Sequence, residues 1–195
     1  MKKLLDRIFI DGLGGMAQGL FATLIIGTII QQIGLFMGGG TGDLIYELGK
    51  IAAGLTGAGI GVGVARKLEA GHLVIVSAAV VGMIGAFAGK ILSGQVLVDG
   101  NLVLAGPGEP LGAFAAAYLA IEIGILISGK TKLDIILTPL VCIGTGSAVG
   151  LFVGPPISEF MLWLGSLINW GTEQQPFLMG IVVSVLMGMI LTLPI

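Results

Sequence analysis

The sequence predicts an all-α integral membrane protein, and three observations carry this prediction. Only 10% of the 195 residues are charged, 55% are hydrophobic, and the mean hydropathy is +1.08. Soluble domains carry about 25% charged residues, so this chain has too few charges to cover a surface in water. The composition therefore excludes an ordinary soluble enzyme, a nucleic-acid-binding protein and a disordered tail.

Six apolar stretches are about long enough to cross a bilayer, for which a helix needs about 20 residues. They cover residues 13–37, 44–65, 73–92, 111–128, 135–153 and 177–193. Residues 1–12, ahead of them, place apolar side chains on one helical face and charged side chains on the other. This pattern predicts a short amphipathic helix that lies in the membrane interface.

Residues 157–168 are also apolar, but they are too few to cross the membrane. They follow Gly154, Pro155 and Pro156, and two prolines remove two backbone donors from a helix. We therefore expect the fifth span to break at this point. Residues 157–168 would then form a short re-entrant or interfacial helix, and the break would line a cavity, as irregular backbone does at membrane depth.

Basic residues gather in alternate loops between the predicted spans. Most of the nine Lys and Arg residues lie before the first span, between the second and third, and between the fourth and fifth. They are Lys2, Lys3, Arg7, Arg66, Lys67, Lys130 and Lys132. The loops 38–43 and 93–110 contain none. Because short loops rich in Lys and Arg stay in the cytoplasm, the N-terminus is predicted to be cytoplasmic.

Small residues recur at every fourth position in several spans. Gly57 and Gly61 lie in the second span, and Gly146 and Gly154 lie in the fifth. Such spacing lets two helix backbones approach closely, which favours tight packing inside a membrane. The alternative is a surface along which helices slide during transport.

The segment Gly124–Thr131 matches the phosphate-loop pattern GxxxxGK[ST] in every defined position. That loop requires a strand before it, so that free N–H groups at a helix N-terminus hold phosphate. Here the glycines end an apolar span, and we expect a helix C-terminus that binds no nucleotide. Cys142 and His72 are each the single residue of their type, without partners at ligand spacing. We therefore expect no intramolecular disulfide, metal site, cofactor or catalytic residue.

Polar residues inside or beside the spans are the candidates for solute binding. Glu122 lies in the fourth span, where an ionisable group costs about 2.5–3.5 kcal/mol at the bilayer centre. It should therefore face a polar cavity or contact a neighbouring helix, and both alternatives remain open. Thr145 and Ser147 precede the expected break in the fifth span. Glu159 in the short helix and Gln18 in the first span complete the candidate set.

The order of several short motifs along the chain is informative. They are Gly106-Pro-Gly-Glu-Pro110, Gly129-Lys-Thr-Lys-Leu-Asp134, Thr138-Pro139, Gly144-Thr-Gly146, Gly154-Pro-Pro-Ile157, Leu167-Ile-Asn-Trp170 and Leu193-Pro-Ile195. In this order they resemble the membrane-embedded IIC permeases of the phosphoenolpyruvate-dependent sugar phosphotransferase system. Within that family they are most similar to the IIC-like proteins that include the perfringolysin O regulator.

The resemblance implies a permease component of the bacterial cell membrane that binds and translocates a small polar solute, a sugar above all. It also implies a homodimer and cytosolic partners of the IIA and IIB type, since the chain is no enzyme by itself. The alternative is a membrane-embedded sensor or regulator that binds a solute without transporting it. Because IIC permeases continue into further helices, residues 1–195 would form one membrane domain, the N-terminal part of a longer permease-like fold.

Overall fold

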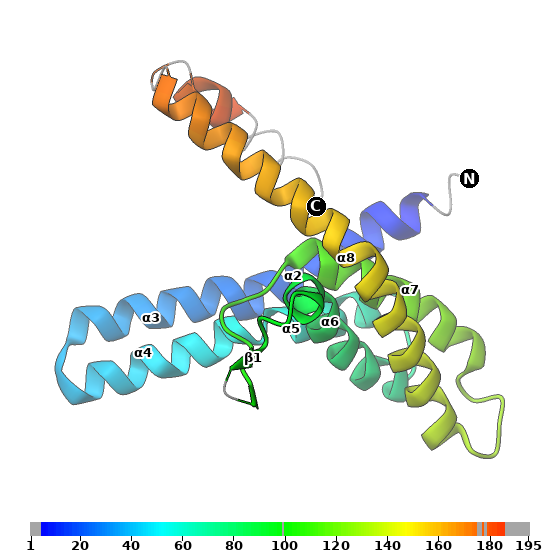
Figure 1. Cartoon of the computed structure of the whole chain (residues 1–195). Helices are drawn as coiled ribbons and strands as arrows, with labels where there is room; N and C mark the ends of the chain where they lie inside the picture. Colours follow the sequence, from blue (N-terminus) through cyan, green and yellow to red (C-terminus); the bar gives the residue numbers. More distant parts are fainter. Residues whose placement is uncertain (1–4, 99, 175–176, 178, 186–195) are drawn as a thin grey trace.

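The computed structural model describes residues 5–98, 100–174, 177 and 179–185, most of them helical (Figure 1). The helices are η1 (Arg7–Gly12), α2 (Leu13–Leu20), η2 (Phe21–Ile25), α3 (Ile26–Met37), α4 (Gly39–Gly54), α5 (Thr56–Lys67), α6 (His72–Leu92), α7 (Pro110–Ile127) and α8 (Asp134–Gln174), and the strands β1 (Leu97–Val98) and β2 (Asn101–Leu102) form a small antiparallel hairpin. Within the described residues, four helices are long and apolar enough to cross a membrane, and the bent pair α4–α5 makes a fifth. The predicted all-α membrane class is therefore confirmed.

The first span is one continuous helix of 31 residues, Arg7–Met37, built from η1, α2, η2 and α3. The described residues are helical from Leu5 and run directly into the span, so this part is continuous with α2. The interfacial position of residues 1–12 stays a prediction. The Arg7 guanidinium of the first turn lies 2.6 Å from a carboxylate oxygen of Glu122 on α7. This ion pair holds the charged first turn against the other helices.

The second predicted span, residues 44–65, is bent rather than straight. α4 ends at Gly54, α5 begins at Thr56, and their axes differ by 50°. The buried Thr56 hydroxyl donates to the Ala53 carbonyl oxygen at 2.6 Å, which stabilises the backbone at the bend. α4 packs back along α3, and the α3–α4 hairpin extends away from the remaining helices (Figure 1).

The core of the fold is a bundle of α2, α5, α6, α7 and the inner part of α8. Its largest fully buried side chains are mainly apolar and include Ile60, Val64, Val74, Val81, Phe87 and Ile121. Glycines bring the helices together. A Cβ on Gly57 of α5 would lie 2.6 Å from the Gly82 carbonyl oxygen of α6, and Gly61 approaches Ala78 of α6 in the same way. Because backbone lies so close, these positions have no room for a side chain.

The predicted break in the fifth span is wrong, because α8 is one helix from Asp134 to Gln174 with Pro155 and Pro156 inside it. Proline removes a donor but keeps a φ that suits a helix. The residue before a proline usually avoids the helical region because its Cβ is crowded, and here that residue is Gly154. A Cβ on Gly154 would also lie 2.6 Å from the Cβ of Ala88 on α6.

Residues 157–168 are therefore not a separate short helix but the continuation of α8. This helix of 41 residues measures roughly 60 Å at about 1.5 Å per residue, about twice the hydrocarbon thickness of a bilayer. Its outer half extends away from the bundle (Figure 1). The sixth predicted span, residues 177–193, lies largely outside the described residues.

Candidate functional site

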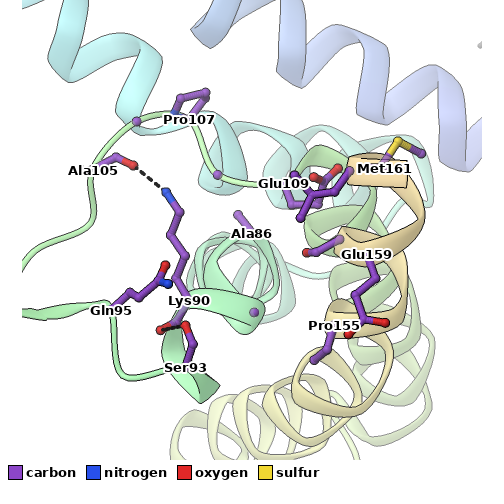
Figure 2. Close-up of a pocket in the computed structure, with 15 residues that line it drawn as sticks. Ala86, Lys90, Ser93, Gln95, Ala105, Pro107, Glu109, Pro155, Glu159 and Met161 are labelled. Atoms are coloured by element: carbon purple, nitrogen blue, oxygen red, sulfur yellow. Dashed lines mark hydrogen bonds between the residues drawn. The ribbon is translucent and has the colours of Figure 1, made fainter. Parts of the chain in front are cut away.

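A cavity of about 850 Å³ lies at the C-terminal end of α6 (Figure 2). Its walls are the last turns of α6, parts of the connection from α6 to α7, and the middle of α8. Polar side chains reach it from all three walls and belong to Lys90, Ser93, Gln95, Glu109, Ser158 and Glu159. The volume falls in the range of about 300–1,000 Å³ that is typical of small-molecule sites.

The segment of residues 105–109, which we term the strap, crosses the end of α6 and leads into α7. Gly106 and Gly108 have φ angles of +84° and +75°, which favour glycine. A Cβ on Gly108 would lie 2.7 Å from the Cβ and 2.8 Å from the carbonyl oxygen of Ala86. The next residue, Glu109, donates its N–H to the same carbonyl oxygen at 2.7 Å. Backbone contact with α6 therefore sets the position of Glu109.

Lys90 connects α6 to the other end of the strap. Its Nζ donates to the Ala105 carbonyl oxygen at 3.1 Å (Figure 2). The same ammonium group lies 5.4 Å from the centre of the Phe87 ring, a distance at which the ring stabilises a cation. An ammonium group carries three donors, so Lys90 can hold the strap and still donate to a ligand.

Glu109 is the N-cap residue of α7, and its side chain lies near α8 in Figure 2. Burial raises the pKa of this carboxyl above its ordinary value, and a hydrogen bond from the backbone of Leu111 opposes the rise. Among the described residues, no Lys, Arg or His side chain forms an ion pair with it. Glu109 is thus a partly desolvated acceptor at the positive end of a helix dipole.

α8 contributes Pro155, Ser158 and Glu159 to the cavity. Ser158 faces Gly89 of α6, on which a Cβ would lie 3.4 Å from the Ser158 hydroxyl oxygen. The missing side chain at Gly89 therefore leaves this hydroxyl open to the cavity. Glu159 is the next residue along α8 and is exposed, and it also lines the cavity.

Part of the predicted solute-binding set lies elsewhere. Glu159 lines the cavity, whereas Thr145, Ser147 and Gln18 do not. The Thr145 hydroxyl donates to the Val141 carbonyl oxygen of its own helix at 2.6 Å, and Ser147 is half-buried on α8. Gln18 is exposed on the first helix. A role for these three residues in solute binding stays a prediction.

Sequence reasoning missed Lys90, Gln95 and Glu109. The motif that contains Glu109, Gly106-Pro-Gly-Glu-Pro110, carries a usable signal, because alternating glycine and proline mark a turn with demanding backbone angles. Lys90 carries none, since a lysine at the end of an apolar span is ordinarily interpreted as an anchor in the lipid head groups.

Glu122 lies toward the other end of α7, roughly 20 Å along the helix from Glu109 at about 1.5 Å per residue. Its Oε1 accepts from Arg7 Nε at 2.6 Å, and its Oε2 accepts from Arg7 Nη2 at 3.4 Å. The Arg7 and Glu122 side chains are 40% and 33% exposed. Glu122 therefore contacts a neighbouring helix in the structure, and its role in solute binding stays a prediction.

The segment that matches the phosphate-loop pattern has a different geometry. Gly124 lies within α7, and the helix ends at Ile127 without any preceding strand. Gly129 has a φ of +76° and donates its N–H to Asp134 Oδ1 at 2.8 Å. The Thr138 hydroxyl donates to the same oxygen at 2.6 Å. The Gly129 N–H, which a bound phosphate would need as a donor, is therefore already bonded to the Asp134 carboxylate.

Membrane-length helices beside a cavity lined by apolar and polar side chains are the architecture of a multi-pass membrane protein with a candidate site for a small molecule. Residues 10–195 match the family model described as Phosphotransferase system, EIIC. The chain belongs to this family and is a membrane permease component of the phosphotransferase system. No curated protein and no solved structure matches the chain at the significance required. The closer similarity to the perfringolysin O regulator group stays a prediction.

Proposed function

We propose that this permease component binds a sugar in the cavity between α6, the strap and α8, and translocates it. One observation carries the proposal: the cavity combines hydroxyl, amide, carboxylate and ammonium groups in about 850 Å³. Sugar hydroxyls both donate and accept hydrogen bonds, and this set of side chains supplies both kinds of partner. The apolar lining from Ala86, Met161 and Leu162 suits the C–H faces of a sugar ring.

Three side chains would make the main contacts. Glu109 accepts hydrogen bonds from ring hydroxyls, and no cationic side chain among the described residues competes for its carboxylate. Ser158 donates from the α8 side, where Gly89 leaves it room. Lys90 donates from the α6 side while it holds the strap. A solute between them would therefore contact three segments of the chain at once.

The distribution of basic residues supports an orientation with the cavity toward the outside. The N-terminus and the loops that carry Arg66, Lys67, Lys130 and Lys132 would face the cytoplasm. The cavity lies at the opposite end of α6 and α7 from these loops. The solute would thus enter from the outside. Cytosolic partners of the IIA and IIB type would meet the basic loops, and the permease would work as a homodimer.

Calorimetric titration of the purified protein with hexoses, hexitols and disaccharides tests the binding site. We expect one sugar class to bind, Glu109→Gln to weaken binding about tenfold, and Ser158→Ala to weaken it about fivefold. Glu47→Gln is the matched control, because Glu47 is an exposed carboxylate on α4 that pairs with Lys50. Equal effects of Glu109→Gln and Glu47→Gln would contradict the assignment of the site.

Uptake into vesicles tests translocation separately from binding. Vesicles that contain the protein and its IIA and IIB partners with phosphoenolpyruvate should accumulate the sugar that binds in calorimetry. Binding without any accumulation would instead favour the alternative, a membrane sensor that reports a solute without moving it.

A further inference from the structure

Two consecutive prolines divide α8 beside the cavity. Pro155 and Pro156 have no N–H group, so they donate no helical hydrogen bond to the carbonyl oxygens of Leu151 and Phe152, one turn earlier. Pro155 itself lines the cavity (Figure 2). A helix bends more easily where two adjacent hydrogen bonds are missing, and sharp bends in helices occur mainly at proline. The longest described helix therefore has a weak point next to the candidate site.

The part of α8 before the prolines is fixed to the bundle by glycines. Gly146, Gly150 and Gly154 follow one another at steps of four residues. A Cβ on Gly150 would lie 3.2 Å from the Cβ of Ala116 on α7, and a Cβ on Gly154 would lie 2.6 Å from the Cβ of Ala88 on α6. Gly146 approaches the same two helices closely. Such close packing leaves this part of α8 little freedom to move against α6 and α7.

Residues 157–174 of α8, which we term the outer segment, have no such support. Among the described residues, no atom lies within 4 Å of the Cβ position of Gly165. Phe160, Leu162 and Trp163 are 52%, 75% and 57% exposed. The segment extends away from the bundle in Figure 1. Lipid is as apolar as these side chains, so the outer segment can turn about the prolines without a cost from exposed apolar surface.

The outer segment nevertheless carries one wall of the cavity. Ser158, Glu159, Met161 and Leu162 line the cavity from this side, opposite Lys90 of α6 and the strap (Figure 2). The opposite wall is fixed, because hydrogen bonds join the strap to α6 at both of its ends. The cavity thus lies between a wall that the bundle holds in place and a wall that follows a weak point in α8.

We propose that residues 154–156 form a hinge, about which the outer segment swings toward α6 and away from it and so closes and opens the cavity. A solute that contacts both walls favours the closed position, because it binds that position more tightly. The axial distance from Pro156 to Trp163 is roughly 10 Å at about 1.5 Å per residue, so a bend of roughly 30° moves Trp163 by roughly 5 Å. Closure over a solute rests on the proposed binding site, whereas the hinge itself does not.

Distances between two spin labels, measured by pulsed electron paramagnetic resonance in lipid nanodiscs without any solute, test the hinge. The labels are attached to p-acetylphenylalanine in place of Leu119 on α7 and Trp163 on the outer segment, which are 43% and 57% exposed. The control pair replaces Leu119 and Leu140, both within the bundle. We expect the distances of the first pair to spread about twice as widely as those of the control pair. Equally narrow distributions for both pairs would overturn the hinge.

Proline variants test the cause of the spread. Pro155→Ala/Pro156→Ala restores both backbone donors, so the spread between positions 119 and 163 should narrow to that of the control pair. Pro139→Ala is the matched control, because Pro139 also lies inside α8 but precedes the glycines that pack on the bundle. It should leave the spread unchanged. A spread that the double variant does not alter, or that Pro139→Ala narrows equally, would overturn the assignment of the hinge to the two prolines.

A disulfide between the two walls tests the movement itself. The Cβ position of Gly89 lies 3.7 Å from the Cβ of Ser158, within the range of about 3.5–4.5 Å that disulfides require. With Cys142→Ala as background, oxidation of Gly89→Cys/Ser158→Cys should join the walls and narrow the spread, and reduction should restore it. Failure of the disulfide to form, or a spread that stays wide once it has formed, would overturn the proposal. None of these measurements uses a sugar, so failure of the hinge and failure of the sugar site are distinguishable.

Discussion

The two glutamates of α7 occupy contrasting environments at opposite ends of one helix. Glu122 forms a two-point contact with Arg7 of the first helix, which occupies both of its oxygens. Glu109 has no basic partner among the described residues and lines the cavity instead. The carboxylate of Glu122 joins two helices, whereas that of Glu109 faces the cavity without a cationic partner among the described residues. The presence of an ion partner, rather than the position of the carboxylate along the span, therefore indicates whether the carboxylate connects helices or is a candidate for binding.

The supports of the two glutamates also differ. Glu122 is fixed through its side chain, so removing Arg7 frees it. Glu109 is fixed through backbone, because its N–H bonds to Ala86 and the preceding Gly108 packs on the same residue. A change at Glu109 itself should therefore alter the ligand site and leave the fold intact, whereas a change at Gly108 should disturb both.

The largest effect is expected from Gly108→Val. A side chain there meets Ala86 backbone and must also adopt a φ of +75°, so we expect a loss of about 2–5 kcal/mol of stability. The strap would shift from α6 and carry Glu109 with it, so sugar binding should be lost. Thermal unfolding in detergent and calorimetry measure the two effects.

Gly94→Val is the matched control for this variant. Gly94 has a similar φ of +71° but no atom within 4 Å of its Cβ position. It should show the backbone strain alone, about 1–2 kcal/mol, with sugar binding retained. If both variants keep binding, contact with Ala86 does not position Glu109.

The sequence predicts the class of fold well and the shape of individual helices less well. Apolar stretches of membrane length and the four-residue spacing of Gly57 and Gly61 are local features, and both correspond to helices and contacts in the structure. Before Pro155, the lack of a Cβ on Gly154 relieves the crowding that proline causes, and it lets α8 pack closely on Ala88 of another helix. Such a tertiary contact is not visible in the sequence of one span.

The candidate site is harder to predict because its residues come from three distant segments. Glu159 is predicted from its position beside a span and does line the cavity. Thr145 and Ser147 depend on a break that is absent, so nothing opens the helix beside them. Lys90 becomes informative only when its bond to Ala105 shows that it holds the strap. Contacts across segments, rather than residue types, define this site.

A smaller effect is expected from Glu122→Ala, which leaves Arg7 without its partner. Removing one partner of a fully buried ion pair lowers the free energy of unfolding by about 3–5 kcal/mol, and removing one partner of an exposed pair lowers it by at most about 1 kcal/mol. With both side chains partly exposed, we expect a loss of about 1–2 kcal/mol and unchanged sugar binding. The double variant Arg7→Met/Glu122→Met should recover most of the stability.

Glu47→Ala provides the exposed counterpart, since Glu47 and Lys50 are 60% and 64% exposed and lie 3.6 Å apart. Its unfolding temperature should match that of the wild type. A decline in sugar binding with Glu122→Ala at unchanged stability would break the comparison, because Glu122 would then act in solute binding as well.

The smallest effect is the dependence of stability on pH that Glu109 contributes at the cavity end of α7. Burial raises the pKa of Glu109 above its ordinary value of 4.5. The folded state therefore binds more protons than the unfolded state between the two values. The contribution of Glu109 to stability is complete at a pH below its ordinary pKa. This contribution is lost as pH rises through the pKa of Glu109 in the folded state. The unfolding temperature of the wild type, measured relative to that of Glu109→Gln, should fall over this window.

Sugar affinity should change in the opposite direction and rise with pH, because the ionised carboxylate is the better acceptor of hydroxyl protons. Ser158→Ala removes no titratable group and should keep both trends. If the wild type and Glu109→Gln show the same pH profile for stability and for binding, Glu109 is not the titrating group of the cavity.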